Sequence, residues 1–264
     1  MEGQKVRIDG LAGSVFLPSA NRDSGRVALN FPGFPSRYHA TPIVSKLLEA
    51  GYAVFQPQYY GTYDSAGSFN PYLAHKTISD AMNILSRTGI RTVHDDVLIE
   101  PRECVDLVVA HSFGTYAAVR AIVEYQVPPR LLLLAPMLQF GIHARESGLV
   151  LDFSEHVEKI TVLQPLTHRL ESAKQLFNFY ATDSEYLPDP DPIRGGERRC
   201  TVGLFAGSKD PGLMAGAAIR ASRLVLSRYA FFDIEIAQVI DGAEHGVDTM
   251  LSADGRAAIE SFVL

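Results

Sequence analysis

Apolar residues follow two spacings along this chain, and each spacing marks one kind of element. Short apolar or alternating runs bounded by glycine, proline or polar residues predict strands, whereas apolar residues three and four positions apart predict helices. The predicted strands cover residues 5–8, 14–17, 26–31, 52–56, 104–110, 130–135, 201–206 and 232–240. The predicted helices cover residues 39–50, 72–88, 212–229 and 247–263, together with the segment that follows Ser112.

The order of these elements predicts the fold class. The first two strands are joined by Asp9-Gly10, a pair typical of a tight β-hairpin. From Arg26 onward strands and helices alternate, which favours a parallel sheet whose two faces are both covered by helices. The sequence therefore predicts an α/β protein with a mostly parallel, eight-stranded sheet flanked by helices.

Residues 137–198 interrupt this alternation. They carry scattered aromatic and aliphatic residues among histidines and acids, and they end in a proline-rich stretch at 188–192. We interpret the segment as a mainly helical lid inserted after the sixth strand, which leaves residues 1–136 and 199–264 as the core. The alternative is a set of ordinary surface helices with no role in substrate binding.

Composition and charge narrow the classes of function. The 264 residues are 47% hydrophobic and carry a formal net charge of -6, without a cluster of lysine and arginine, so no nucleic-acid partner is expected. No apolar run has the length of a membrane span or a signal peptide, so we expect a soluble, cytoplasmic protein. Cys104 and Cys200 are expected to be reduced thiols. No metal is expected, because the histidines of the insertion lack the spacing of zinc ligands; they are His143, His156 and His168.

The stretch 105–125 begins as a strand and continues as a helix, with Ser112 at the break. Small residues stand two positions before and after this serine, at Ala110 and Gly114, as in the G-x-S-x-G pattern of a nucleophile elbow. They allow strand and helix to pack closely at a sharp turn, which exposes the serine oxygen beside the N–H groups of the helix N-terminus. The alternative is a serine that caps an ordinary helix.

A serine hydroxyl becomes a good nucleophile only when a base takes its proton and a carboxylate orients that base. In an open α/β sheet such groups belong at the carboxyl ends of strands. Asp210 follows the strand at 201–206, and His245 follows the strand at 232–240, so we expect both beside Ser112. The alternatives are a turn aspartate and an exposed loop histidine. Weaker candidates for the acid lie in the insertion; they are Asp183, Asp189 and Asp191.

The transition state of such a reaction needs N–H donors for its oxyanion. One is expected from the backbone of Phe113, the residue after the nucleophile, and one from Phe34 in the loop after the strand at 26–31. Gly33 gives this loop conformational freedom, although a plain turn is the alternative. His111, next to the nucleophile, is expected to point away from the Ser112 oxygen and to serve packing.

These motifs together resemble the α/β-hydrolase fold. The resemblance covers about residues 5–264 and is carried by NFPGFP, VVAHSFG, LFAGSKDPG and DGAEHG. The chain is similar to the branch of carboxylesterases, thioesterases, lysophospholipase-like enzymes and serine aminopeptidases with a lid between the sixth and seventh strands. The resemblance implies Ser112 as nucleophile, His245 as general base and acid, and Asp210 as the residue that orients it. It also implies the Phe34 and Phe113 amides as the oxyanion hole.

The chain departs from that pattern in three places. Pro32 stands where the family has a histidine before the glycine of the oxyanion loop, so whatever that histidine fixes must be fixed otherwise. Ala110 replaces the first glycine of the elbow. The loop at 58–65 lacks the family's aspartate and arginine and carries tyrosines instead, so a relative's substrate does not transfer directly.

The sequence favours a serine hydrolase that cleaves a carboxylic ester of a small hydrophobic or aromatic substrate, without a cofactor. A thioesterase, an amidase or peptidase, an acyltransferase and a lyase remain alternatives on the same scaffold. A non-catalytic module that binds a small ligand or a protein remains an alternative of another class. The apolar residues of the insertion would serve a homodimer contact equally well. The expected substrate-binding residues are Gly33, Tyr59, Tyr60 and Phe140.

Overall fold

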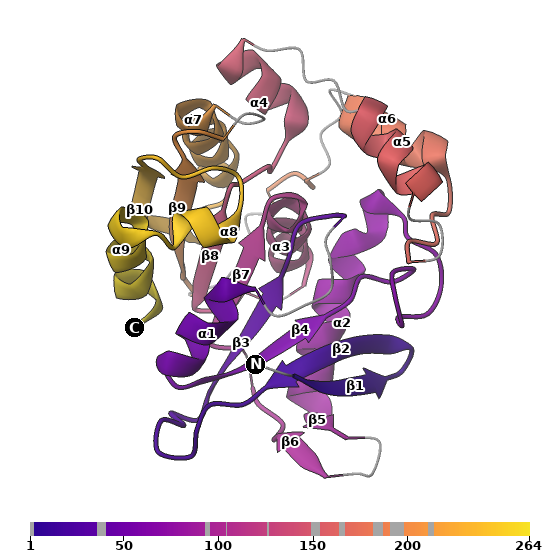
Figure 1. Ribbon diagram of the computed structural model, residues 1–264, viewed down its shortest axis with the longest axis vertical. Coiled ribbons are helices and arrows are strands. Elements are labelled where there is room, and N and C mark those ends of the chain that lie inside the picture. Colours follow the sequence, from indigo (N-terminus) through magenta and orange to yellow (C-terminus); the bar gives the residue numbers. More distant parts are fainter. Residues whose placement is uncertain are drawn as a thin grey trace.

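The computed structural model describes residues 3–35, 41–92, 96–103, 105–125, 127–148, 154–163, 167–181, 187–190, 198–210 and 214–264. An eight-stranded sheet in the order β1-β2-β4-β3-β7-β8-β9-β10 forms its centre (Figure 1). The strands are β1 (Gln4–Ile8), β2 (Leu11–Phe16), β3 (Arg26–Phe31), β4 (Tyr52–Pro57), β7 (Leu107–His111), β8 (Arg130–Leu134), β9 (Cys200–Gly207) and β10 (Phe232–Ile240). β2 is antiparallel to β1 and β4, and the other neighbours are parallel, which confirms the predicted fold class.

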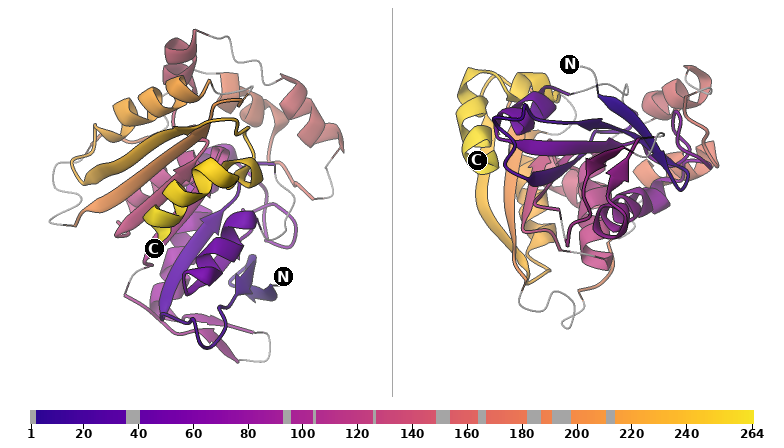
Figure 2. Two further views of the ribbon diagram at one scale, coloured as in Figure 1. Left: turned by 60° about the vertical axis from the view of Figure 1, so that its left-hand side comes forward. Right: turned by 90° about the horizontal axis from the view of Figure 1, so that it is seen from below.

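Helices cover both faces of the sheet, as the alternation of elements predicted. α1 (Pro42–Glu49) and α9 (Ala253–Val263) lie on one face, and α2 (Ala74–Arg87), α3 (Phe113–Glu124) and α7 (Ala215–Leu226) lie on the other (Figures 1 and 2). The central strands are consequently apolar on both sides. In β8 the four leucines from Leu131 to Leu134 are all fully buried, and each contributes about 2 kcal/mol through burial.

Most element boundaries agree with the sequence prediction, with four differences. The strand predicted at 14–17 begins earlier, at Leu11, and the strand predicted at 104–110 begins only at Leu107. The predicted helix at 247–263 is two helices, α8 (Val247–Met250) and α9, because the chain turns at Leu251 and Ser252. A small antiparallel sheet of β5 (Ile90–Arg91) and β6 (Val97–Ile99) was not predicted, since strands so short show no periodicity. A short 3-10 helix, η1 (Pro71–Leu73), precedes α2.

Parts of several predictions lie outside the described residues. They include Cys104, the beginnings of the helices predicted at 39–50 and 212–229, and parts of the insertion predicted at 137–198. Cys200 is buried with a free thiol, whose pKa burial raises to about 12. No helix among the described residues is long and apolar enough to cross a membrane.

The segment between β8 and β9 contains helices α4 (Phe140–Ser147), α5 (Ser154–Leu163) and α6 (Ala173–Ala181), at the top of Figure 1. α4 packs on α7, where Arg220 pairs with Glu146 at 3.0 Å. α6 reaches the core through Phe179, whose ring centre lies 5.6 Å from that of Phe113. The helical content agrees with the prediction, and the role of the segment as a lid stays a prediction.

Backbone hydrogen bonds also fasten this segment to the loop that follows β4. The Arg169 N–H donates to the Gly61 carbonyl at 2.7 Å, and the Phe69 N–H donates to the Arg169 carbonyl at 2.7 Å. The Arg169 guanidinium donates to the Tyr63 carbonyl at 2.8 Å. The insertion is therefore tied to the core at a point between α5 and α6 as well as through β8 and β9.

Candidate active site

Ser112 lies at the sharp turn between β7 and α3. Its backbone has φ 53° and ψ −125°, a conformation that costs a non-glycine residue about 1–3 kcal/mol. The Ser112 N–H donates to the Leu134 carbonyl at 2.9 Å, which fixes the turn to β8. The serine side chain makes no capping hydrogen bond to α3, so the alternative of a simple helix cap does not hold.

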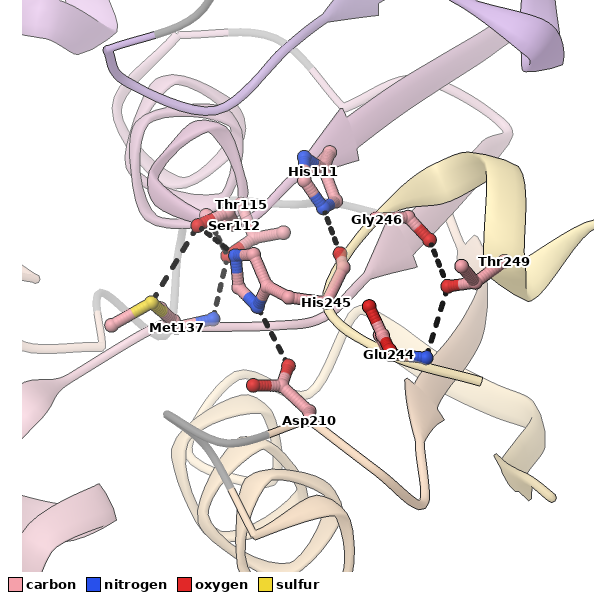
Figure 3. A network of polar contacts seen from close by, with 9 residues as sticks. All are labelled: His111, Ser112, Thr115, Met137, Asp210, Glu244, His245, Gly246 and Thr249. Carbon is pink, nitrogen blue, oxygen red and sulfur yellow. Dashed lines mark hydrogen bonds and ion pairs between the residues drawn. The ribbon is translucent and has the colours of Figure 1, made fainter. Parts of the chain in front are cut away.

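A continuous hydrogen-bonded path joins Ser112, His245 and Asp210 (Figure 3). The Ser112 Oγ lies 2.9 Å from His245 Nε2, and His245 Nδ1 lies 2.6 Å from the Asp210 Oδ2. The Asp210 side chain is fully buried, whereas that of His245 is 37% exposed. Because the carboxylate can only accept, Nδ1 carries the proton and Nε2 is free to accept from the serine hydroxyl.

The register of the sheet brings these residues together. His111 pairs with Leu134, and Gly207 pairs with Ile240, so the central strands end at one edge. The loops after β7, β9 and β10 all leave from that edge and carry the serine, the aspartate and the histidine. Among the other candidate acids, Asp189 is 94% exposed and pairs with Arg228, while Asp183 and Asp191 lie outside the described residues.

The loop after β3 lies against Ser112. A Cβ on Gly33 would lie 3.0 Å from the Ser112 Cβ, and one on Gly114 would lie 2.7 Å from the Phe31 carbonyl oxygen. Gly114 therefore lets the first turn of α3 approach β3. Phe34 and Phe113, the predicted amide donors, lie on the two sides of this contact, with ring centres 5.7 Å apart.

Tyr59 supports this loop at Pro32, the residue that stands where the family pattern has a histidine. Its hydroxyl donates to the Pro32 carbonyl at 3.1 Å, and the side chain is buried. Burial raises the pKa of Tyr59, so the phenol keeps its proton and remains a donor. The structure thus shows Tyr59 bonded to the loop after β3, and its expected contact with substrate stays a prediction.

Solved structures resemble the chain in fold, although no profile of a known protein family and no curated protein sequence matches it. Est1E from Butyrivibrio proteoclasticus with ferulic acid bound has a TM-score of 0.59 and 16% identity over 97% of this chain and 98% of that chain. MGS-MChE2, an α/β hydrolase enzyme from the metagenome of lagoon sediments at Mar Chica, Morocco, has a TM-score of 0.60 and 9% identity over 98% and 96%. The chain has the α/β-hydrolase fold.

A further structure with this α/β-hydrolase fold is the N-acyl homoserine lactonase AidH in complex with N-hexanoyl homoserine lactone. It has a TM-score of 0.58 and 14% identity over 100% of this chain and 96% of that chain. At such identities the likeness establishes the fold, and the chemistry must be argued from this chain's own residues.

Tyr60, another of the expected substrate-binding residues, contacts α2, and its role in substrate binding stays a prediction. Its hydroxyl donates to Asp80 of α2 at 3.0 Å, and it borders a separate cavity of about 350 Å³. Burial and the Asp80 carboxylate raise the pKa of Tyr60 to about 12. Phe140 is buried at the start of α4, with its ring centre 5.6 Å from that of Phe179, which in turn contacts Phe113.

Thr115 and Met137 also contact Ser112, although neither was predicted from the sequence. The Ser112 Oγ lies 3.7 Å from the Met137 Sδ. The Thr115 hydroxyl donates to the Ser112 carbonyl at 2.5 Å and accepts from the Met137 N–H at 2.8 Å. Met137 begins the insertion directly after the strand predicted at 130–135, and that position was the only available signal.

His111 contacts the backbone of His245, a contact that was not predicted from the sequence. Its Nε2 lies 2.7 Å from the His245 carbonyl oxygen, and the two imidazole centres are 5.1 Å apart. Desolvation by the surrounding protein, with a smaller contribution from His245, lowers the pKa of His111 to about 4. The interpretation of His111 as a packing residue is therefore incomplete.

Ser112 is not among the lining residues of two cavities in the described part of the chain. One of about 450 Å³ is bordered by the end of α3 and the turn before β10, with Tyr125, Pro188 and Tyr229 in its wall. Tyr229 closes part of it by donating to the Pro188 carbonyl at 2.6 Å. In the part of the chain that the structure describes, no three His, Cys, Asp or Glu side chains form a potential metal site.

Proposed function

We propose that this protein is a serine hydrolase that cleaves a carboxylic ester of a small substrate through an acyl-enzyme. The observation that carries the proposal is the path from Asp210 through His245 to Ser112, with steps of 2.6 and 2.9 Å, at a strained turn. These distances lie within hydrogen-bond reach, as a nucleophile, its base and the group that orients the base require.

The proposed reaction has two halves. The Ser112 Oγ attacks the ester carbonyl while His245 Nε2 takes its proton, and the imidazolium then gives this proton to the departing alkoxide, which leaves as an alcohol. A water molecule next attacks the acyl-enzyme, His245 again takes the proton, and Ser112 leaves with the proton returned to it. Asp210 accepts from the Nδ1–H throughout and stabilises the imidazolium.

The oxyanion of each tetrahedral intermediate is assigned to the backbone N–H groups of Phe34 and Phe113. Phe113 is the first residue of α3, where backbone N–H groups have no partner within the helix. The close approach of Gly33 to Ser112 supports a donor from the neighbouring loop, and the Tyr59 hydroxyl fastens that loop at Pro32. Each donor of this kind contributes about 3–4 kcal/mol to a typical transition state.

A hydrophobic acyl or aromatic group is the proposed substrate feature. Aromatic rings meet at the first residue of α3, where the ring centre of Phe113 lies 5.7 Å from that of Phe34 and 5.6 Å from that of Phe179 in the insertion. The ferulic acid in the Est1E structure is an aromatic acid, and the ligand of AidH carries a hexanoyl chain, which supports the same class here. We assign residues 137–198 as a lid because two residues of this segment reach the site: Phe179 contacts Phe113, and Met137 contacts Ser112.

The proposal is tested by hydrolysis of p-nitrophenyl esters of increasing acyl length in ¹⁸O-labelled water. We expect turnover that depends on acyl length, with solvent oxygen in the acid product. Ser112→Ala should abolish it, whereas Ser227→Ala, at an exposed serine after α7, should not. Preference for a thioester or an amide would change the substrate class, and product without solvent oxygen would indicate a lyase or acyl transfer. Ligand binding that survives Ser112→Ala, without any turnover in wild type, would favour a binding module.

A further inference from the structure

His111, at the end of β7, and Ser112, in the turn that follows, both contact His245, one at its backbone and the other at its ring. Ser112 contacts the imidazole through Nε2 at 2.9 Å, and the ring of His111 contacts the backbone carbonyl of the same histidine at 2.7 Å (Figure 3). We propose that His111 is a positioning residue, whose ring N–H fixes the backbone of His245 at the distance from Ser112 that proton transfer requires. The inference rests on the proposed function and adds a residue to its machinery.

The loop that carries His245 is fastened on its other sides by bonds that do not involve β7. The Lys209 N–H, after β9, donates to the Ala243 carbonyl at 2.8 Å. On the side of α8, Thr249 Oγ1 accepts from the Glu244 N–H at 2.9 Å and donates to the Gly246 carbonyl at 2.8 Å. Neither attachment sets the position of the loop relative to the nucleophile. The His111 contact does, because His111 ends β7 and Ser112 is the next residue.

The chemistry of this contact specifies which nitrogen of the His111 ring carries a proton and whether the ring is charged. A carbonyl oxygen can only accept, so His111 Nε2 must carry a proton and donate it. The titratable groups that face the ring are His245, Asp210 and Asp248, and desolvation outweighs the attraction of the two carboxylates, so His111 is neutral at neutral pH. Neutrality matters because a cation at His111 would oppose the imidazolium that forms on His245 during the reaction.

The surroundings also limit which side chains can replace His111. A Cβ on Gly33 would lie 3.4 Å from His111 Nδ1, so the ring packs against the loop of the proposed oxyanion donor. Glutamine places an uncharged N–H donor at about the reach of Nε2, and leucine keeps an apolar side chain of similar branching without a donor. His111→Gln and His111→Leu therefore separate the hydrogen bond from the packing.

His75→Gln is a matched control, because it also replaces a histidine whose pKa is lowered but does so away from Ser112. His75 is buried in α2, pairs with Glu124 at 3.0 Å, and has a pKa lowered to about 4 by burial and by the Arg120 charge. Its partner lies at the end of α3 opposite to Ser112. His75→Gln should affect folding as much as the His111 variants without changing the geometry around Ser112.

The experiment measures, for the full chain and these three variants, the second-order rate of Ser112 labelling by a fluorophosphonate across the neutral pH range. We expect His111→Leu to label about tenfold to a hundredfold more slowly at every pH, because a small displacement of the base costs that much. His111→Gln should stay within about threefold of wild type, since the donor is restored. His75→Gln should label at the wild-type rate.

Two results would overturn the proposal: His111→Leu labelling as fast as wild type, or His111→Gln labelling as slowly as His111→Leu. A second readout is the far-downfield proton NMR signal of the His245 Nδ1–H bonded to Asp210, which His111→Leu should weaken and the other two variants should retain. If wild type does not label at all, the proposed function fails, and the NMR signal alone still decides whether His111 orders His245.

Discussion

At the scale of single residues, Ser112 occupies a backbone conformation that glycine adopts far more readily than serine. Its φ of 53° places the Cβ in a strained position, and the neighbouring strands and helix enforce that position. The arrangement trades stability for the position of the Ser112 oxygen, because the same turn aims that oxygen at His245.

The first prediction concerns this strain. Ser112→Gly should be more stable than Ser112→Ala by about 1 kcal/mol in urea unfolding, because glycine relieves the positive φ. Both variants should lose ester turnover by about 10⁴-fold or more, because neither has a nucleophile. Equal stability of the two variants would show that the turn relaxes when the serine is removed.

The second prediction separates the two neighbouring tyrosines. Tyr59→Phe leaves the Pro32 carbonyl without its donor, so turnover should fall about tenfold and stability by about 1–2 kcal/mol. Tyr60→Phe removes a partly exposed bond to Asp80 and should change turnover less than threefold. If Tyr60→Phe lowers turnover as much as Tyr59→Phe, Tyr60 acts on the site in a way that its contacts do not explain.

At the scale of elements, the approach of α3 to β3 depends on Gly114. A Cβ there would lie 2.7 Å from the Phe31 carbonyl oxygen and 2.9 Å from that of Pro32, so the helix or the loop would have to shift. That loop carries the proposed donor Phe34. The contact therefore links helix packing directly to the geometry of the site.

The third prediction compares Gly114→Ala with Gly216→Ala. The first should lower stability by about 1–3 kcal/mol and reduce ester turnover, because it crowds backbone atoms. The second is at an exposed position in the first turn of α7, where a Cβ would meet only the flexible end of Arg220 at 3.3 Å, so it should raise stability by about 0.5–1 kcal/mol. Thermal unfolding and turnover of both variants provide the measurement; a neutral or stabilising Gly114→Ala would contradict the packing argument.

The elements themselves were largely predictable, and the contacts between them were not. Strand and helix periodicity located β3, β4, β9 and β10 to within about a residue or two, and the rule of strand ends selected Asp210 and His245. The bonds from Tyr59 to Pro32 and from His111 to His245 join residues 27 and 134 positions apart. Sequence spacing does not reveal where a side chain points after the fold closes, so these contacts required the structure.

At the scale of the whole molecule, two histidines link stability to pH. The native pKa values of His75 and His111 are lowered to about 4, mainly by desolvation, whereas an unfolded histidine has a pKa of about 6.5. Below about pH 6.5 the unfolded chain therefore binds protons that the native protein does not bind. Their contribution to stability is complete above that pH and is lost as the pH falls toward about 4.

The fourth prediction follows from this linkage. The midpoint of urea unfolding should fall for wild type as the pH drops from about 6.5 to 4, and it should fall less steeply for the His75→Gln, His111→Gln double variant. Carboxylates titrate in both proteins and contribute the same slope, so the difference isolates the histidines. Parallel curves would mean that the two imidazoles titrate normally in the native state.

The central claim is that Ser112 is a nucleophile activated by His245 and Asp210. The most direct measurement is the intact mass of the protein after treatment with a fluorophosphonate, followed by peptide mapping, for wild type, His245→Gln and Asp210→Asn. We predict a single adduct on Ser112 in wild type, with labelling slowed by about 10³-fold or more in each variant. An adduct on another residue, or labelling of Ser112 that both variants leave unchanged, would contradict the claim.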